Sequence, residues 1–161
     1  MNFYKQLLIV GFLALMLSCS QEGEEIFKPI LESKVSYTKL ENEILKRVNI
    51  HRDSIGLNKL EKLDLVSAIA LSHSKYMVEK GKVSHDNFSN RYENLIVNAD
   101  AKFVGENVAF GFDSAKGVVY SWLKSNVHRA VIENPNFTHF GISTEKNIKE
   151  RNYFTQIFIE K

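Results

Sequence analysis

Residues 103–112 read FVGENVAFGF, a run rich in β-branched and aromatic side chains. A run of this composition, placed between the loop-forming residues 98–102 and Ser114, predicts a β-strand. Before this strand the apolar residues repeat mainly at helical spacing, whereas after it some segments have helical spacing and others strand spacing.

The N-terminal side of this strand carries apolar residues at helical spacing. Leu40, Ile44 and Val48 recur every four residues with charges between them, which is typical of an amphipathic helix. Asp64 is a suitable cap for a second helix, and Gly81 a suitable end. The predicted helices cover residues 37–53, 64–80 and 91–96.

On the C-terminal side, Ser114 is expected to cap a further helix that includes Trp122. Pro135 then prevents a short helical turn from continuing. Two strands separated by a charged hairpin loop end the chain. The predicted helical segments are 114–123 and 128–132, and the strands are 140–145 and 153–159. This order predicts an α+β fold, in which helices cover an antiparallel sheet.

Length and composition fit one exported globular domain rather than a nucleic-acid-binding protein. The chain has 161 residues, of which 44% are hydrophobic and 25% charged, so it can bury a full core. Lys and Arg total 21 against 19 Asp and Glu, and this balance gives no cluster of positive charge for phosphates. We expect a monomer that does not bind nucleic acid.

Residues 1–18 are typical of a signal peptide. Lys5 precedes the apolar run 7–17, which is shorter than the ~20 residues that a membrane-spanning helix needs. Ser18 stands directly before Cys19, and this arrangement resembles a bacterial lipobox, in which the cysteine becomes diacylated. The alternative is an ordinary cleaved signal whose cysteine lies near the cut by chance.

Cys19 is the only cysteine of the chain. The domain therefore has no disulfide, no thiolate metal site and no cysteine nucleophile. Residues 19–36 are polar and acidic at first and suit a flexible tether. We expect residues 37–161 to form the domain, held by lipid, such as palmitate, at the periplasmic or cell-surface face of a membrane.

Seven short pieces of the chain occur in one order that suggests a family. The pieces are Asn49-x-His51-Arg52 with Gly56-Leu57; Ala70 and His73; Ser84-His85; Gly105-Glu106-Asn107; Trp122-x-x-Ser125-x-x-His128-Arg129; Phe140-Gly141-Ile142; and Tyr153-Phe-Thr-Gln156. The ordered set resembles the bacterial branch of the CAP superfamily, which also contains cysteine-rich secretory and pathogenesis-related proteins. The resemblance extends over residues 40–158.

The resemblance implies a three-layer α-β-α sandwich with a central antiparallel sheet and an open cleft. In members of the family the cleft usually holds two histidines and two acids, which in some cases bind zinc or another divalent metal. By position, His85 matches the first histidine and Glu106 the first acid. The second histidine is missing from residues 153–156, so His128 is the expected replacement. Ser125 stands where eukaryotic members have the second acid.

The expected cleft residues are His85, Glu106, Asn107, Ser125, His128 and Gln156. Two imidazoles and one carboxylate, from His85, His128 and Glu106, would give a three-ligand zinc site with an open position for water. The alternatives are structural: His85 bonded to backbone, His128 paired with Glu106, and Glu106 satisfied by backbone N–H groups. Ser125 and His128 lack a Gly-x-Ser-x-Gly nucleophile turn, which argues against a serine hydrolase.

The remaining histidines have structural interpretations. His51 and Arg52 are expected to cap the first helix at its C-terminal end. His73 is expected to be a partly buried helix residue, and His139 an exposed loop residue.

Two functions remain open at this point, so the sequence does not decide whether the protein is an enzyme. The first is a lipid-anchored module that binds a lipid, a cell-wall fragment or a protein in the His/Glu cleft. The alternative is a divalent-metal-dependent hydrolase of a peptide or cell-envelope substrate, with Glu106 as ligand or general base. A third possibility is an inert spacer.

Overall fold

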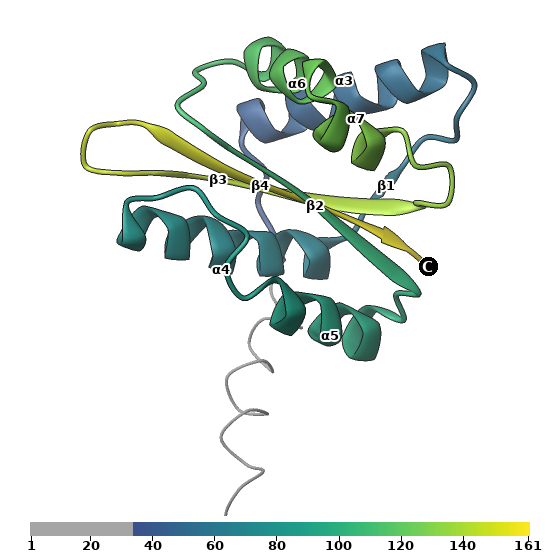
Figure 1. Cartoon of the computed structure of the whole chain (residues 1–161), viewed down its shortest axis with the longest axis horizontal. Coiled ribbons are helices and arrows are strands. Elements are labelled where there is room, and N and C mark those ends of the chain that lie inside the picture. Colours follow the sequence, from purple (N-terminus) through teal and green to yellow (C-terminus); the bar gives the residue numbers. More distant parts are fainter. Residues whose placement is uncertain (1–33) are drawn as a thin grey trace, which may run out of the picture. The chain divides into compact units, whose positions relative to one another are not determined.

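A computed structural model describes residues 34–161 (Figure 1). The predictions for the signal peptide, for Cys19 and for most of the tether lie outside the described residues. The elements are α3 (Lys39–Ser54), β1 (Glu61–Lys62), α4 (Asp64–Lys80), α5 (Phe88–Ala99), β2 (Phe103–Phe110), α6 (Ala115–Lys124), α7 (Asn126–Ile132), β3 (His139–Lys146) and β4 (Asn152–Glu160).

The sheet has the strand order β1-β3-β4-β2. Strand β4 lies in the middle and pairs antiparallel with both β3 and β2. Its residues 152–159 are all buried, as expected of a strand that is covered on both faces. Strand β1 was not predicted, because it has only two residues, both exposed, and it pairs parallel with β3.

Helices cover both faces of this sheet, which confirms the predicted α+β sandwich. Helices α4 and α5 lie on one face, and α3, α6 and α7 lie on the other (Figure 1). The apolar core lies between the sheet and the second group, where Trp122 of α6 packs edge-on against Phe154 of β4. A sheet enclosed in this way reaches solvent only at its edges.

The helix boundaries follow local capping chemistry. Thr38 accepts a hydrogen bond from the Glu41 N–H, and the Glu41 carboxylate accepts one from the Thr38 N–H, so α3 begins in a capping box. Helix α4 ends at Gly81, whose φ of 65° is left-handed, as predicted. The predicted Asp64 cap is wrong by one residue, because Leu63 is the N-cap and Asp64 begins the helix.

Helix α5 is longer than the predicted segment 91–96. It runs from Phe88 to Ala99, so residues 98 and 99 are helical and not part of a loop. The prediction included Arg91 but missed one turn at each end, because Ser89, Asn90 and Asn98 are residues that favour loops and caps.

The outer side of β3 is closed by its neighbours. Strand β1 covers His139 and Phe140. Beyond it, the N–H of Ile142 donates to the Ser67 hydroxyl at 3.2 Å, and the N–H of Thr144 donates to the Glu41 carboxylate at 2.7 Å. Two side chains from helices thus take the place of a further strand.

Candidate functional site

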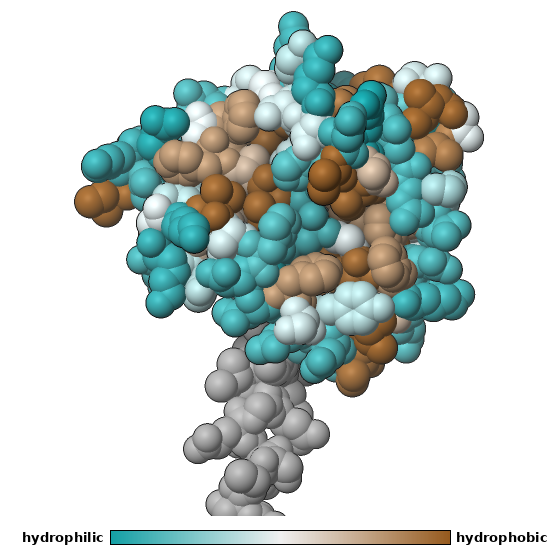
Figure 2. Space-filling view, viewed as in Figure 1, coloured by the Kyte–Doolittle hydropathy of each residue, from teal (hydrophilic) through white to brown (hydrophobic). Residues whose placement is uncertain are grey.

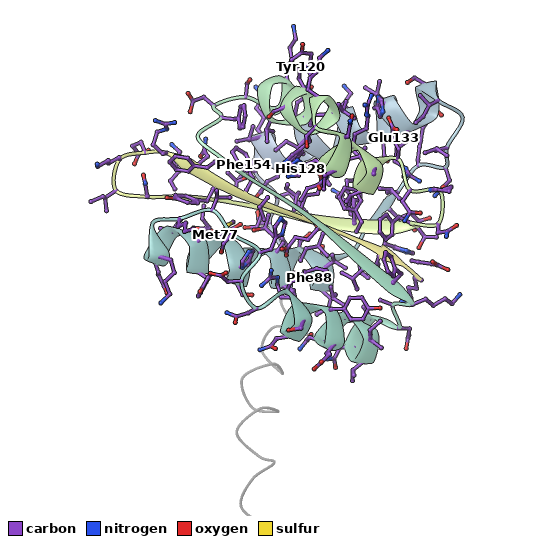
Figure 3. The ribbon with its side chains drawn as sticks, in the orientation of Figure 1. Met77, Phe88, Tyr120, His128, Glu133 and Phe154 are labelled. Carbon is purple, nitrogen blue, oxygen red and sulfur yellow. The ribbon has the colours of Figure 1, made fainter. Side chains whose placement is uncertain are left out.

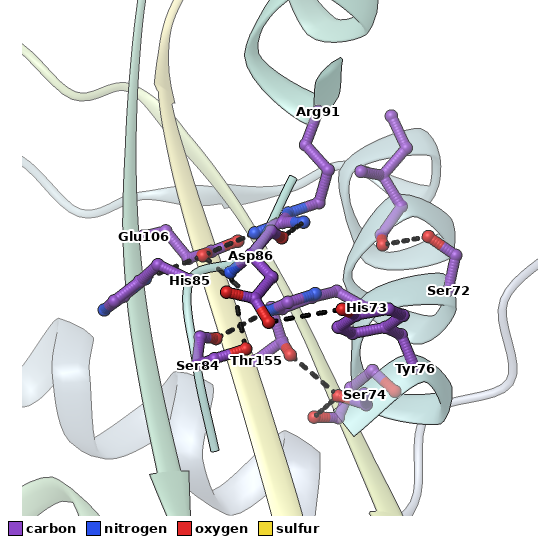
Figure 4. Close-up of polar contacts among 12 residues, drawn as sticks. Ser72, His73, Ser74, Tyr76, Ser84, His85, Asp86, Arg91, Glu106 and Thr155 are labelled. Atoms are coloured by element: carbon purple, nitrogen blue, oxygen red, sulfur yellow. Dashed lines mark hydrogen bonds and ion pairs between the residues drawn. The ribbon is translucent and has the colours of Figure 1, made fainter. Parts of the chain in front are cut away.

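Glu106 is the centre of a buried polar cluster beneath strand β2. Its side chain is 1% exposed. Arg91 of α5 donates from Nε to one carboxylate oxygen at 2.8 Å and from Nη2 to the other at 2.7 Å. His85 donates from Nδ1 at 2.8 Å (Figure 4). This is a bidentate, charge-assisted arrangement, which is among the stronger kinds of hydrogen bond.

The pKa of Glu106 reflects two opposing effects. Burial by itself raises the pKa, but the hydrogen bonds from His85 and Arg91, together with the Arg91 charge, lower it below its ordinary value. The carboxylate is therefore ionised and fully engaged by side chains. The predicted alternative, satisfaction by backbone N–H groups, is wrong, because the partners are a guanidinium and an imidazole.

The loop that carries His85 is held from two directions. His73 of α4 donates from Nε2 to the Ser84 carbonyl at 2.8 Å, and Arg91 donates to the Asp86 carbonyl at 2.7 Å. His73 is 2% exposed, so it is fully buried and not partly buried as predicted. Burial and the nearby Arg91 charge lower the pKa of His73, so its ring is neutral. The position of His85 is thereby fixed.

His128 lies on the other side of strand β2 from α5 (Figure 3). Its Nδ1 is 2.8 Å from the Ser125 hydroxyl, so the predicted pairing of His128 with Glu106 is wrong. Burial lowers the pKa of His128, and the charge of His85 lowers it further.

Asn107 and Gln156 are inside the protein, so the prediction that they line the open cleft is wrong. Both are 0% exposed, and they face each other in the β2–β4 register. Asn107 donates to the His128 carbonyl at 3.1 Å. The amide atoms of Gln156 have no hydrogen-bond partner within the described part of the chain. Neither side chain is accessible to a ligand in this structure.

The three predicted metal ligands do not form a metal site. Within residues 34–161 no group of three or more His, Cys, Asp and Glu side chains is placed to hold a metal ion. The physical reason is that Arg91 and His85 already occupy both oxygens of Glu106. A cation at this carboxylate would have to displace the Arg91 guanidinium, which carries the same sign of charge. The residues present therefore do not fit the predicted zinc.

A groove of about 360 Å³ lies beside this cluster. Its lining is mainly apolar, with His85 and Glu106 at one side; the residues are His85, Phe88, Phe103, Val104, Gly105, Glu106, Ala130, Val131, Asn134 and Phe137. Phe88 belongs to α5 and Val131 to α7, which cover opposite faces of the sheet. The groove therefore passes around the outer edge of β2, on the face where Figure 2 shows apolar side chains between these helices.

The aromatic residues of this groove were not identified as ligand-contacting from the sequence. Phe88, Phe103 and Phe137 have the spacing of ordinary core residues, and an edge-to-face contact of Phe88 through Tyr92 to Phe103 supports that interpretation locally. Phe103 begins the edge strand β2, and Phe88 and Phe137 lie beside that edge from α5 and from the segment before β3. This position depends on strand order and is not visible in local periodicity.

Three other polar residues have structural roles. Arg52 is 0% exposed and donates to carbonyls of Asn58, Ile132 and Asn134 at 2.7–2.8 Å, so it ties distant loops together and does not cap its own helix. His51 pairs with Glu133 of the α7 C-cap at 2.8 Å. His139 is the first residue of β3 and not a loop residue.

Within the part of the chain that the structure describes, no helix has the length and apolarity required to cross a bilayer.

Comparison with known proteins gives one consistent result. Residues 45–158 match the model of the cysteine-rich secretory protein family, CAP. A membrane protein of Bacillus subtilis, YlbC, is 32% identical over 146 residues, which cover 85% of this chain and 40% of the relative. The chain spans half or less of the length of the curated relatives that it matches.

Solved structures agree on the fold. An outer surface protein of Borrelia burgdorferi has a TM-score of 0.70 at 19% identity, covering 80% of this chain and 98% of that one. An extracellular SCP-domain protein of Bacillus anthracis has a TM-score of 0.67 at 25% identity, covering 80% of this chain and 45% of that one.

Proposed function

The chain belongs to the cysteine-rich secretory protein (CAP) family, and from this membership and the groove at strand β2 we propose that it is an exported, lipid-anchored binding protein. Its ligand places an apolar part in the groove between α5 and α7 and a polar part near His85 and His128. The names of the related proteins, which describe a membrane, an outer-surface and an extracellular protein, support the export part of this proposal.

The observation that carries the binding proposal is the contrast between the groove and the cluster beside it. The groove is lined by Phe88, Phe103 and Phe137, so an apolar ligand gains free energy there in proportion to the area it buries. The Arg91–Glu106–His85 cluster is fixed and already satisfied. It therefore fixes the wall of the groove and presents one half-exposed ring, His85, for polar recognition.

A divalent-metal-dependent hydrolase is the second candidate, and it has less support. Its carboxylate is unavailable, which leaves His85 and His128 as two isolated ligands of the expected three. Calorimetric titration of the tag-free domain with Zn²⁺ tests it. Micromolar zinc binding that is lost in His85→Ala and in His128→Ala would supply the metal site that the hydrolase requires. Hydrolysis of a peptide or muropeptide by the zinc-loaded domain would then overturn the non-enzymatic proposal.

Two substitutions on α7 test whether the groove binds ligand. Ala130 is exposed and lines the groove, whereas Val127, on the same helix, is 76% exposed and does not line it. Ala130→Phe fills the groove without entering the core, and Val127→Phe is the matched control. Binding is measured by NMR shift changes with a lysophospholipid, a muropeptide and a random heptapeptide library as probes.

The proposal expects at least one of these probes to bind the unmodified domain and the Val127→Phe variant, and to bind Ala130→Phe much more weakly. Equal binding to all three proteins would place the ligand elsewhere. Absence of binding by every probe class at millimolar concentration would remove the proposed function.

The anchor is tested separately. Cys19→Ser is expected to abolish incorporation of radiolabelled palmitate and to move the protein from the membrane fraction to the soluble exported fraction. Unchanged labelling or unchanged membrane association in that variant would contradict lipid anchoring at Cys19.

A further inference from the structure

The groove follows a sheet edge whose backbone groups are free. Strand β2 pairs with β4 and is the last strand in the order β1-β3-β4-β2. The residues Val104, Gly105 and Glu106 of this edge line the groove. Each of these residues turns its N–H and C=O groups either toward β4 or toward the groove.

The β2–β4 hydrogen-bond ladder shows which residues face β4 and which face the groove. Gly111 continues the β2–β4 register and donates to the Asn152 carbonyl at 2.8 Å. Because bonded residues alternate in an antiparallel ladder, the odd-numbered Gly105 bonds to β4, and the even-numbered Val104 and Glu106 turn their backbone groups outward. No hydrogen bond among residues 34–161 uses these outward groups.

The next outward residue along the strand provides an independent check. Trp122 of α6 donates from its indole N–H to the carbonyl of Val108 at 3.0 Å, as an outward carbonyl allows. The side chain of Trp122 therefore caps the edge at Val108. By the same alternation Phe110 is outward and, among residues 34–161, unpaired as well. The unpaired groups beside the groove are those of Val104 and Glu106, which are 2% and 7% exposed in the free domain.

An unpaired portion of this kind is uncommon on a sheet edge that is otherwise protected, because an unpaired edge strand can form hydrogen bonds with a strand of another chain. On the opposite edge Ser67 and Glu41 occupy the corresponding N–H groups of Ile142 and Thr144. Two outward residues present alternating donors and acceptors at the spacing of a strand, ~3.3 Å per residue. A lipid chain has no groups that match this array, whereas an extended polypeptide does.

We propose that the groove binds an extended peptide segment of another protein, which adds to the sheet as a further strand beside β2. The inference rests on the proposed binding function and names the ligand class. The segment's backbone bonds to Val104 and Glu106, and alternate side chains point to the two sides of the edge. We expect the bound peptide to carry apolar side chains at these alternating positions, because Val131 and Phe137 line one side of the groove and Phe88 lines the other.

Trp122 limits the length of the added strand. Since its indole occupies the carbonyl of Val108, pairing cannot continue past this point without moving a side chain that is 2% exposed. The paired segment is thus short, about three to five residues at strand spacing. Affinity for a segment of this length depends on the side chains in the groove as well as on the backbone.

The experiment selects heptapeptides from a phage-displayed random library against the unmodified domain, with Ala130→Phe as the counter-selection target. The best peptide is then resynthesised with N-methyl groups on each amide in turn. N-methylation removes one backbone donor and leaves the side chains unchanged. We expect alternate amides to be intolerant, with losses of about tenfold or more, and the intervening amides to tolerate the change.

Amide hydrogen exchange gives a second measurement on the protein itself. The N–H groups of Val104 and Glu106 should exchange faster than those of Gly105 and Asn107 in the free domain, and at least about tenfold more slowly with peptide bound. Those of Gly105 and Asn107, which bond to β4, should be protected in both states. Val104 and Glu106 amides that are already protected, or that stay unprotected when peptide is bound, overturn the proposal.

The remaining outcomes separate this inference from the proposed function. Selected peptides that tolerate N-methylation at every position overturn strand addition and leave groove binding in place. If no peptide is selected but the lysophospholipid or the muropeptide binds, strand addition fails and the binding function stands. If no probe binds at all, both fail together.

Discussion

The two edges of the sheet are built differently. On the β3 edge, Ser67 and Glu41 bond to the outward N–H groups of Ile142 and Thr144, and helix α4 lies against the strand. On the β2 edge, one carbonyl is capped by Trp122, and the groups at Val104 and Glu106 open into the groove. The difference shows that the β3 side is closed by strand β1 together with two side chains, whereas in the described domain the β2 edge has no such cover beside the groove.

The polar groups of the two edges are also used differently. Glu41 bonds directly to the backbone of its edge strand, whereas the Glu106 carboxylate is held by the side chains of Arg91 and His85. A charge that is satisfied by side chains leaves the backbone beside it free. Four changes test this contrast.

The largest expected effect is at the ion pair beneath the open edge. Arg91→Met leaves the buried Glu106 carboxylate without its guanidinium and should lower the free energy of unfolding by about 3 to 5 kcal/mol. Urea unfolding followed by the fluorescence of Trp122, the single tryptophan, measures this. Adding Glu106→Gln should recover part of the loss, because it removes the bare charge. An undiminished loss in the double variant would contradict the ion-pair explanation.

The second effect compares one glycine near each edge. A Cβ on Gly141 would overlap the backbone of Ser67 in α4, which cannot move alone, so Gly141→Ala should cost about 1 to 3 kcal/mol. A Cβ on Gly105 would meet the ring of Phe137 at 2.8 Å and a methyl group of Val131. These are side chains beside an open groove that can shift, so Gly105→Ala should cost less than about 1 kcal/mol. Equal losses in denaturant unfolding would remove this distinction between the two edges.

The third change opens the closed edge. Glu41→Ala leaves the Thr144 N–H without its acceptor and also removes the capping box, which should cost about 1 to 3 kcal/mol. Glu43→Ala is the matched control on the same helix, since its contact with Arg47 is exposed and worth little. Light scattering should detect self-association in Glu41→Ala only. A monomeric Glu41→Ala variant would mean that this edge needs no side-chain protection.

The smallest effect is the dependence of stability on pH. The pKa of Glu106 is lowered, so its contribution is present above its ordinary pKa of 4.5 and is lost as pH falls through the lowered value. The pKa values of His73 and His128 are lowered from 6.5, so protonation favours the unfolded chain as pH falls below that value. The contributions of all three groups to stability decrease as the pH falls, so the free energy of unfolding should decrease from neutral pH toward acid.

His128→Gln separates one part of this dependence. Because it removes only the contribution of one half-buried ring, the slope of stability against pH should flatten slightly just below pH 6.5 and stay unchanged near the Glu106 range. Urea midpoints at a series of pH values provide the measurement. A steeper slope in the variant would mean that His128 is charged in the folded protein.

Much of the fold followed from local sequence patterns. Leu40, Ile44 and Val48 predicted helix α3 because a helix that packs on one side must repeat its apolar residues, and all but Leu40 are buried as expected. Gly81 ended α4 where predicted, since it adopts the left-handed conformation that glycine favours. The three longer strands were also located to within two residues.

The candidate site was predicted less completely, and the reason is physical. His85 and Glu106 were identified and are in contact, but Arg91 was not, because a charged residue on a helix is normally exposed and only tertiary packing buries it. The open edge of β2 could not be predicted either. Whether a strand is central or terminal depends on pairing between distant segments, and local composition does not record it.

The position of β4 has a consequence for how the chain acquires its structure during synthesis. The strand that joins the other two long strands, residues 152–160, is synthesised after both of them. Until β4 has been synthesised, β2 and β3 have no common partner. Arg52 likewise cannot form its hydrogen bonds until the carbonyls that accept them, about eighty residues later in the chain, are present. Nascent chains that stop before residue 152 should therefore remain unfolded, and folding should begin only after residues 152–160 have been synthesised.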